Sequence, residues 1–383
     1  MKIAFIAPDD LSTLIFCKTF TQILNEEYKA DVFTISPVEM YREELKSVKS
    51  THIDISMKRW ISPFYDLLYL IRLIKILRKK RFDYVVTFTT KPNIYGVIAA
   101  KIAGVPNVTI AVRGLGQIFT STHGVKQKII HILVKYLYSF SCSLADKVWF
   151  TNKNDLSYFT TFGIVKSHKT FLTKNAVNLT QFCMEAVSQD VRKNLKRELE
   201  ISEENKVVIM VARLIWSKGI KEYVESAKIL SDKIPLLKFL LVAPVEKESA
   251  DAVPLSYIKE AEQDSNLIWL GFRKDVVDLY AISDLSVLPS YYKEGGYPRA
   301  LLEAMALEKP VISSDSEDCK GPVEDGINGY IVESKNSQAL SEAIYKVFES
   351  DDRRLNFGSN SLKKMKTDFD DQLVVRTVIT NIL

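Results

Sequence analysis

Residues 289 to 329 read PSYYKEGGYPRALLEAMALEKPVISSDSEDCKGPVEDGING, and this stretch indicates a loop that leads into a helix. Gly295 and Gly296 let backbone amides approach a ligand closely, and Pro298 suits the first turn of a helix that RALLEAMA continues. The first amides of a helix have no partner within it, so they and the helix dipole can hold an anion such as a diphosphate.

Two glutamates, Glu294 and Glu303, flank this turn, and their carboxylates can accept hydrogen bonds from sugar hydroxyls. Taken singly, Glu294 reads equally as a solvated loop charge and Glu303 as a charge on a helix surface. Only the sequence pattern of the whole chain can distinguish a binding site from two surface charges.

Short apolar runs without internal charges alternate with helix-length segments, as expected of parallel strands that are buried on both faces. Strands are expected at residues 3–8, 30–36, 82–89, 107–112, 147–152 and 170–175, and again at 206–213, 237–243, 267–271, 285–290 and 310–315. Helices are expected at 13–27, 63–81, 93–103 and 126–144. The polar stretch 183 to 205 separates the two series. This repeated alternation of strands and helices predicts two doubly wound α/β domains with a ligand cleft between them.

Arg213 and Lys218 come just after the first strand of the second series, in VARLIWSKG. The carboxyl end of a strand in such a fold opens toward the ligand, so these two cations can neutralise a diphosphate. The alternative interpretation is that Arg213 and Lys218 are two charges exposed on the surface.

The whole string from residue 289 to 329 resembles the donor-binding region of the retaining family-4 glycosyltransferases. There, a Glu, a Gly-Pro turn, a Leu-Leu-Glu-Ala helix, a Lys-Pro-Val-Ile strand and an Asp-Gly-x-Asn-Gly turn follow in the same order. Seven residues usually separate the two glutamates in that family, whereas eight separate Glu294 from Glu303 here, and the extra residue lies in the GlyGlyTyr loop.

This resemblance implies the α/β fold called GT-B, with two Rossmann-like domains that face a central cleft. We expect an acceptor-binding domain over residues 1–185, a nucleotide-sugar-binding domain over 186–365, and a C-terminal helix over 366–383 that crosses back to the first domain. The implied reaction moves a sugar with retention of configuration and without a metal or other cofactor.

The resemblance also assigns roles around the donor. It implies that Arg213 and Lys218 bind the diphosphate, that Glu303 accepts from both ribose hydroxyls, and that Glu294 orients the donor sugar. Further donor-binding positions are the loop-to-helix residues Gly295, Gly296, Pro298 and Arg299, together with Phe272 and Arg273, which would cover the base. Asp275 is expected to cap the following helix.

In the first domain, many relatives place a histidine where this chain has AVRGLGQIFTSTHG. Arg113 stands near that position, and His123 follows later as a loop histidine. Gly114 and Gly116 recur in the subset that is similar to polyprenol-linked N-acetylgalactosaminyltransferases, where they imply a backbone platform near the donor sugar. A tight structural turn is an equal interpretation of this GxG.

The distribution of charge and the numbers of cysteine and histidine residues indicate which partners and sites to expect. Residues 1 to 190 carry 25 Lys/Arg against 15 Asp/Glu, whereas residues 191 to 383 carry 27 against 32, so the basic first half is expected to face something anionic. No RNA- or DNA-binding motif accompanies this charge, so no nucleic-acid partner is expected. Four scattered cysteines and four histidines suggest neither disulfides nor a metal site. No signal peptide or membrane-spanning run is expected, which fits a cytoplasmic protein.

Residues 58 to 81, KRWISPFYDLLYLIRLIKILRKKR, combine eight Lys/Arg and one acid with aromatic and aliphatic side chains. Such a segment can lie among lipid headgroups of an anionic membrane, although a domain helix with solvated charges explains it too. Lys91 is a second candidate for the acceptor side, because similar relatives carry a lysine there.

We therefore expect a retaining glycosyltransferase that moves an N-acetylhexosamine from a UDP-sugar donor to a polyprenol-diphosphate-linked saccharide at the cytoplasmic face of the membrane. The alternatives are a transferase for a soluble acceptor, a sugar-nucleotide epimerase of the same architecture, and a non-catalytic subunit that binds nucleotide sugars.

Overall fold

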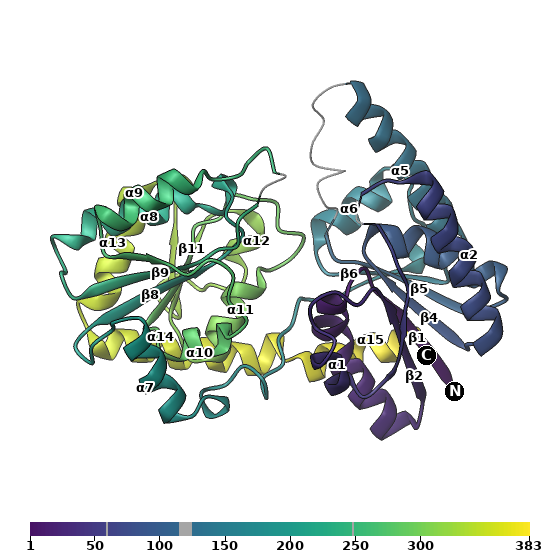
Figure 1. Cartoon of the computed structure of the whole chain (residues 1–383), viewed down its shortest axis with the longest axis horizontal. Helices are drawn as coiled ribbons and strands as arrows, with labels where there is room; N and C mark the ends of the chain where they lie inside the picture. Colours follow the sequence, from purple (N-terminus) through teal and green to yellow (C-terminus); the bar gives the residue numbers. More distant parts are fainter. Residues whose placement is uncertain (59, 115–124, 247–248) are drawn as a thin grey trace. The chain divides into compact units, whose positions relative to one another are not determined.

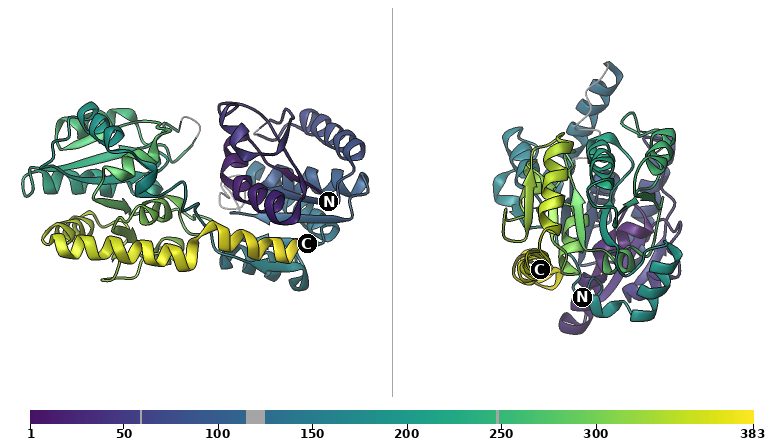
Figure 2. Two further views of the ribbon diagram at one scale, coloured as in Figure 1. Left: turned by 90° about the horizontal axis from the view of Figure 1, so that it is seen from below. Right: turned by 90° about the vertical axis from the view of Figure 1, so that its left-hand side faces the viewer.

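The computed structural model describes residues 1–58, 60–114, 125–246 and 249–383. It divides into two compact units. Unit 1 comprises Met1–Lys174 together with Gln372–Leu383, and unit 2 comprises Asn175–Asp371. Both ends of the chain lie in unit 1, close to each other (Figures 1 and 2).

The described residues of unit 1 form a seven-stranded parallel sheet with the order β3-β2-β1-β4-β5-β6-β7. The strands are β1 (Lys2–Ile6), β2 (Asp31–Ser36), β3 (Thr51–Asp54), β4 (Tyr84–Phe88), β5 (Asn107–Val112), β6 (Lys147–Phe150) and β7 (Thr170–Leu172). The central residues of β1, β2, β4, β5 and β6 are buried on both faces, as the continuous apolar runs predict, whereas the edge strands β3 and β7 are only partly buried.

Two groups of helices cover the two faces of this sheet. One apolar cluster joins the sheet to α2 (Pro63–Lys80), α3 (Val97–Ile102), α5 (Val125–Leu144) and α6 (Lys153–Thr161). A second cluster, on the other face, joins it to α1 (Asp10–Tyr28), η1 (Glu44–Val48) and α15 (Asp371–Ile382). Val375, Val378 and Ile379 are the buried side of α15, so the end of the chain completes the core of unit 1.

Unit 2 repeats the plan with a six-stranded parallel sheet in the order β10-β9-β8-β11-β12-β13. Its strands are β8 (Lys206–Val211), β9 (Leu237–Val242), β10 (Leu267–Trp269), β11 (Leu285–Leu288), β12 (Val311–Ser314) and β13 (Gly329–Val332). Its helices are α7 (Gln189–Glu198), α8 (Ile220–Ser231), α9 (Leu255–Gln263), α10 (Val276–Ala281), α11 (Arg299–Ala306), α12 (Glu317–Lys320), α13 (Ser337–Phe348) and α14 (Asp351–Lys364). Helices α8 and α9 lie on one side of the sheet and α7, α10 and α14 on the other (Figure 1).

The predicted fold class, two doubly wound parallel domains, is confirmed. Sequence reasoning missed two edge strands. β3 is short and half exposed, and β13 begins inside the AspGlyIleAsnGly turn, so neither carries an uninterrupted apolar run. The structural division falls at Lys174 and Asn175, ahead of the polar stretch 183 to 205, because Asn175 and Val177 already bond within unit 2.

Candidate donor site in unit 2

The carboxyl ends of β8, β11 and β12 lie side by side, because these strands are neighbours in the parallel sheet. The loops that follow them therefore meet at one edge. Hydrogen bonds tie them together: the Tyr291 amide donates to the Ser217 carbonyl over 2.9 Å, and the Ser316 hydroxyl donates to the Ser290 carbonyl over 2.9 Å. Of the predicted site residues of unit 2, Arg213 and Lys218 lie in the loop after β8 and Glu294 lies in the loop after β11.

The loop after β8 holds both predicted cations and ends in the 3₁₀ turn η5 (Trp216–Lys218). Gly219 then adopts a φ of 82°, and a Cβ there would lie 2.4 Å from the Pro289 carbonyl oxygen. A glycine is thus required for α8 to start this close to the end of β11. The close approach brings the buried Lys218 to the loop that carries Glu294.

Lys218 and Glu294 form an almost fully buried ion pair, with 2.6 Å between the Lys218 ammonium and Glu294 Oε2. The side chains are only 11% and 9% exposed. The Ser290 hydroxyl donates to the other carboxylate oxygen over 2.8 Å. A buried carboxylate with these donors is held in one orientation, because leaving it unpaired would carry a large desolvation penalty.

The ring of Tyr292 faces both predicted cations. The Arg213 guanidinium carbon lies 5.0 Å from its centroid and the Lys218 ammonium 5.1 Å. Arg213 has no ion-pair partner within the described ranges, so its charge is available to a ligand. Both cations thus lie against the same aromatic ring, which concentrates positive charge beside the loop that carries Glu294.

Asp318 of α12 fixes the GlyGly loop from the other side. Its Oδ2 accepts the Glu294 amide over 3.0 Å, and the Gly296 amide donates to the same carboxylate. Gly295 and Gly296 have φ angles of 72° and 121°, which few side chains tolerate. Burial raises the pKa of Asp318, and the nearby charge of Glu294 adds to this, while the two amides oppose it.

Glu303 lies on α11 and pairs with Arg299 one turn earlier, 3.0 Å apart. Pro298 is the N-cap residue of this helix, one position before the first turn in which the sequence placed it. Burial raises the pKa of Glu303, whereas the charge and hydrogen bond of Arg299 lower it. Arg299 also donates to the Ala176 carbonyl over 3.0 Å, so it orients Glu303 while it is itself anchored.

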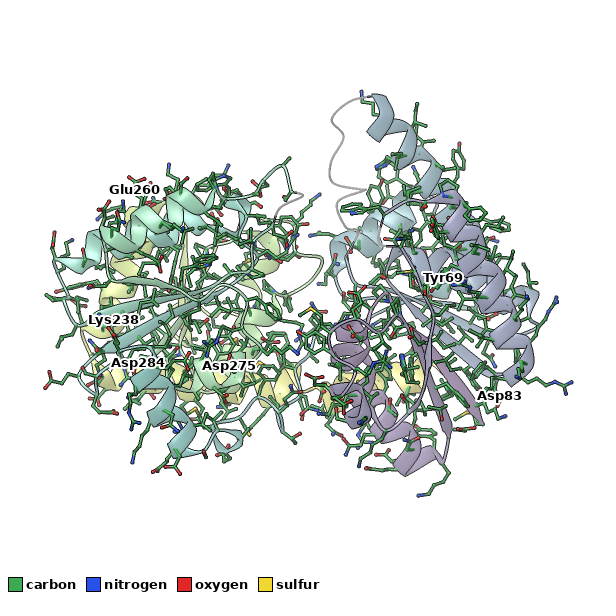
Figure 3. The ribbon with its side chains drawn as sticks, in the orientation of Figure 1. Tyr69, Asp83, Lys238, Glu260, Asp275 and Asp284 are labelled. Carbon is green, nitrogen blue, oxygen red and sulfur yellow. The ribbon has the colours of Figure 1, made fainter. Side chains whose placement is uncertain are left out.

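Phe272 and Arg273, the two residues expected to cover the base, differ in their surroundings. Phe272 is 50% exposed, which leaves its ring open to stacking. Arg273 instead pairs with Asp275 over 2.8 Å and with Glu198 over 2.7 Å. Asp275 (Figure 3) is the N-cap residue of α10, but the expectation that its side chain caps the helix is wrong, because the carboxylate binds Arg273.

Of the positions proposed in unit 1, Arg113 and Gly114 follow β5, and Gly114 has a φ of 116°. The Arg113 guanidinium stacks on Phe16 at 4.3 Å and faces Trp149 at 5.5 Å. Gly116 and His123 lie outside the described residues.

Lys91, considered above for the acceptor, uses its three donors within unit 1. It bonds the carbonyls of Lys58 and Trp60 over 2.8 and 2.7 Å and pairs with Asp66 over 2.6 Å.

Sequence reasoning missed Ser290, Tyr292 and Asp318. All three follow β11 or β12, so the order of the strands in the sheet was the missing information. Together with the predicted residues they make a site that offers two cations, helix-terminal amides and two oriented carboxylates. That chemistry suits a diphosphate joined to hydroxylated sugars.

Comparison with known proteins agrees with this chemistry. Residues 2–152 match the family "Glycosyl transferase 4-like", and residues 191–364 match "Glycosyl transferases group 1". The chain is 28% identical to the Campylobacter jejuni N,N'-diacetylbacillosaminyl-diphospho-undecaprenol alpha-1,3-N-acetylgalactosaminyltransferase, covering 98% of this chain and 96% of the relative.

Two further proteins are similar. The Escherichia coli UDP-Gal:alpha-D-GlcNAc-diphosphoundecaprenol alpha-1,3-galactosyltransferase is 29% identical, over 80% of this chain and 76% of its own. Anabaena HepE in complex with UDP-glucose shares the fold with a TM-score of 0.75 at 19% identity, over 99% of each chain. The chain therefore belongs to the glycosyltransferases, with a group 1 glycosyl transferase domain following a glycosyl transferase 4-like domain.

Proposed function

We propose that this enzyme transfers an N-acetylhexosamine from a UDP-sugar to a polyprenol-diphosphate-linked saccharide, with retention of the anomeric configuration and without a metal ion. The donor part of the proposal rests on the two cations Arg213 and Lys218, which both lie over the Tyr292 ring. The acceptor half is supported by two relatives that are named for diphospho-undecaprenol substrates.

The cations act on the leaving group in this proposal. Breaking the bond between the sugar and the diphosphate leaves negative charge on the phosphate oxygens as an oxocarbenium-like sugar forms. Arg213, Lys218 and the first amides of α11 stabilise that charge, and they do so most strongly where water is excluded. Positive groups fixed in advance would do the work that a divalent cation does elsewhere.

The two glutamates divide the remaining work. Glu303, held by Arg299, accepts hydrogen bonds from the ribose, while Glu294, held by Lys218 and Ser290, orients the hydroxyls of the transferred sugar. Phe272 stacks on the base, and the turn made by Gly295, Gly296 and Pro298 lets the backbone come close to the diphosphate. The resemblance predicts that Arg113, Gly114 and Gly116 of unit 1 also serve the donor sugar.

The acceptor proposed here is bound to a membrane, so the enzyme works at the inner face of the cytoplasmic membrane. Residues 58 to 81 support this, because α2 buries Tyr69, Leu73 and Leu77, leaves Phe64 and Leu67 exposed near its start, and ends in a basic last turn. Within the described residues, none of the helices has the length and apolar character needed to cross a membrane.

A transfer assay tests the proposal. We expect the enzyme, in buffer with EDTA, to transfer sugar from a UDP-N-acetylhexosamine to a synthetic polyprenol-diphosphate-linked saccharide, and the product's anomeric proton to report an α-linkage from the α-linked donor. GDP-sugars serve as controls and should not react. Activity that EDTA abolishes and Mg²⁺ or Mn²⁺ restores would contradict the metal-free chemistry, and transfer to free saccharides only would move the acceptor to a soluble one.

The roles of the glutamates predict two different failures. Glu303→Gln should raise the Kd for UDP about tenfold, since a charge-assisted hydrogen bond contributes roughly 1.5 to 3 kcal/mol. Glu294→Gln should leave the UDP affinity unchanged and lose turnover, because its partner is the sugar. Calorimetry with UDP and a transfer assay measure both effects. The reversed pattern would show that the extra loop residue has exchanged the two roles.

Asp318 is a positioning residue in this account, because it holds the amides of the GlyGly loop and touches no substrate. Asp318→Ala should lower kcat at least about tenfold by releasing Glu294, with little change in the Kd for UDP. Glu317→Ala, next to it on α12 and paired with the exposed Lys320, is the matched control and should behave as wild type. A normal kcat in a folded Asp318→Ala enzyme would remove the loop anchor from the mechanism.

A further inference from the structure

Helix α5 presents an apolar stripe to solvent. Ile129, Ile132, Leu133, Tyr136 and Phe140 are between 53% and 72% exposed, and their spacing of three, one, three and four residues puts them on one side of the helix. The opposite side is buried in unit 1 through Val134, Tyr138 and Cys142. The helix therefore has a second apolar face beyond the one that its own domain uses.

This stripe does not stand alone. Among the described residues, eleven of the twenty-nine exposed large apolar side chains fall within residues 60 to 71 and 129 to 140. Helices α2 and α5 both pack on the same face of the unit 1 sheet, with α3 in contact with each. The first turns of α5 also project beyond the neighbouring elements (Figures 1 and 2). Scattered exposed apolar residues need no explanation, but a gathered set marks an interaction surface.

The segment before α2 is held in place for such a surface. The buried pair of Lys91 and Asp66 also bonds the carbonyls of Lys58 and Trp60, which fixes the backbone that carries Trp60 and Ile61. Trp60 is 54% exposed and Phe64 68% exposed. A rigid backbone that displays aromatic side chains loses little entropy when they become buried.

Charge indicates what this surface meets. Residues 55 to 145 contain fourteen Lys/Arg and two acids, Asp66 and Asp83. Both acids bond within unit 1, Asp66 to Lys91 and Asp83 to the Lys2 amide over 2.7 Å. The segment that carries both sets of exposed apolar residues thus has a large excess of cations over carboxylates. A second copy of the same surface would be repelled, whereas an anionic lipid leaflet is complementary in both charge and apolar character.

We propose that the α5 stripe and the exposed residues of 60 to 71 together form one membrane-docking surface, which inserts into the interface of an anionic bilayer. This inference rests on the proposed lipid-linked acceptor and deepens it. The α5 stripe supplies apolar burial, and the basic end of α2 supplies attraction to the headgroups. The two contributions differ in salt dependence, because only the second is screened.

Vesicle sedimentation without donor or acceptor tests this surface. In the presence of phosphatidylglycerol and phosphatidylethanolamine vesicles, the triple variant Ile132→Gln, Leu133→Gln, Tyr136→Gln should show a partition coefficient at least about tenfold lower than wild type, at low and at high salt. A matched control replaces three exposed apolar residues of unit 2, Leu236→Gln, Ile327→Gln and Leu355→Gln, and should bind as wild type.

A second comparison separates charge from insertion. Replacing Arg78, Lys79, Lys80 and Arg81 by glutamine should remove only the part of the binding that high salt also removes. The Kd for UDP should stay the same in every variant, which shows that unit 2 remains folded. Activity on a short-chain, water-soluble acceptor should survive the α5 substitutions, whereas activity on the same acceptor in vesicles should fall.

Vesicle binding by the α5 variant equal to that of wild type would overturn the proposal. So would a wild-type dimer that the α5 substitutions convert to a monomer without affecting vesicle binding, since the stripe would then be an interface between copies. Failure of the transfer reaction alone leaves the vesicle result unaffected, so the two proposals can fail separately.

Discussion

The buried ion pair between Lys218 and Glu294 joins the loop after β8 to the loop after β11, and the candidate site is built around it. Gly219 makes the pair possible by letting α8 begin against Pro289, and Ser290 and Asp318 hold the Glu294 loop from its other sides. A buried pair costs desolvation energy on both partners, so it stabilises the site only because its geometry and hydrogen bonds are complete. The same hydrogen bonds fix the loop that would face the donor.

This arrangement has a consequence for the chemistry that we propose. Lys218 already has a carboxylate partner, so a donor phosphate would share the ammonium with Glu294. Lys218 would then link the leaving group to the residue that orients the sugar. Arg213 has no competing ion pair within the described part of the chain, and both cations lie over the Tyr292 ring. The positive charge is thus in place before the donor binds. Charges that are positioned in advance stabilise a leaving group most effectively.

The sequence predicted the two doubly wound domains because buried parallel strands leave continuous apolar runs. It singled out the two glutamates because glycine and proline mark the turn between them, and Arg213 and Lys218 because they follow a strand at its carboxyl end. It could not predict that Tyr292 and Asp318 belong to the site. Tyr292 reaches the cations after β8, and Asp318 reaches the loop after β11, only because β11 lies between β8 and β12 in the sheet. The apolar spacing of residues 126 to 144 indicated a helix, but periodicity does not tell which apolar face is buried. The pairing of Arg273 with Asp275 was missed because a side chain two residues away competes with the helix cap.

Calorimetry with UDP and UMP, on the wild type and on Lys218→Met, tests the central claim that this ion pair is part of a diphosphate site. The account predicts that the wild type binds UDP at least about tenfold more tightly than UMP, because the second phosphate gains a charge-assisted contact. In Lys218→Met, which keeps an apolar side chain of similar length, this preference should largely disappear. An unchanged ratio of the two affinities in the folded variant would contradict the account.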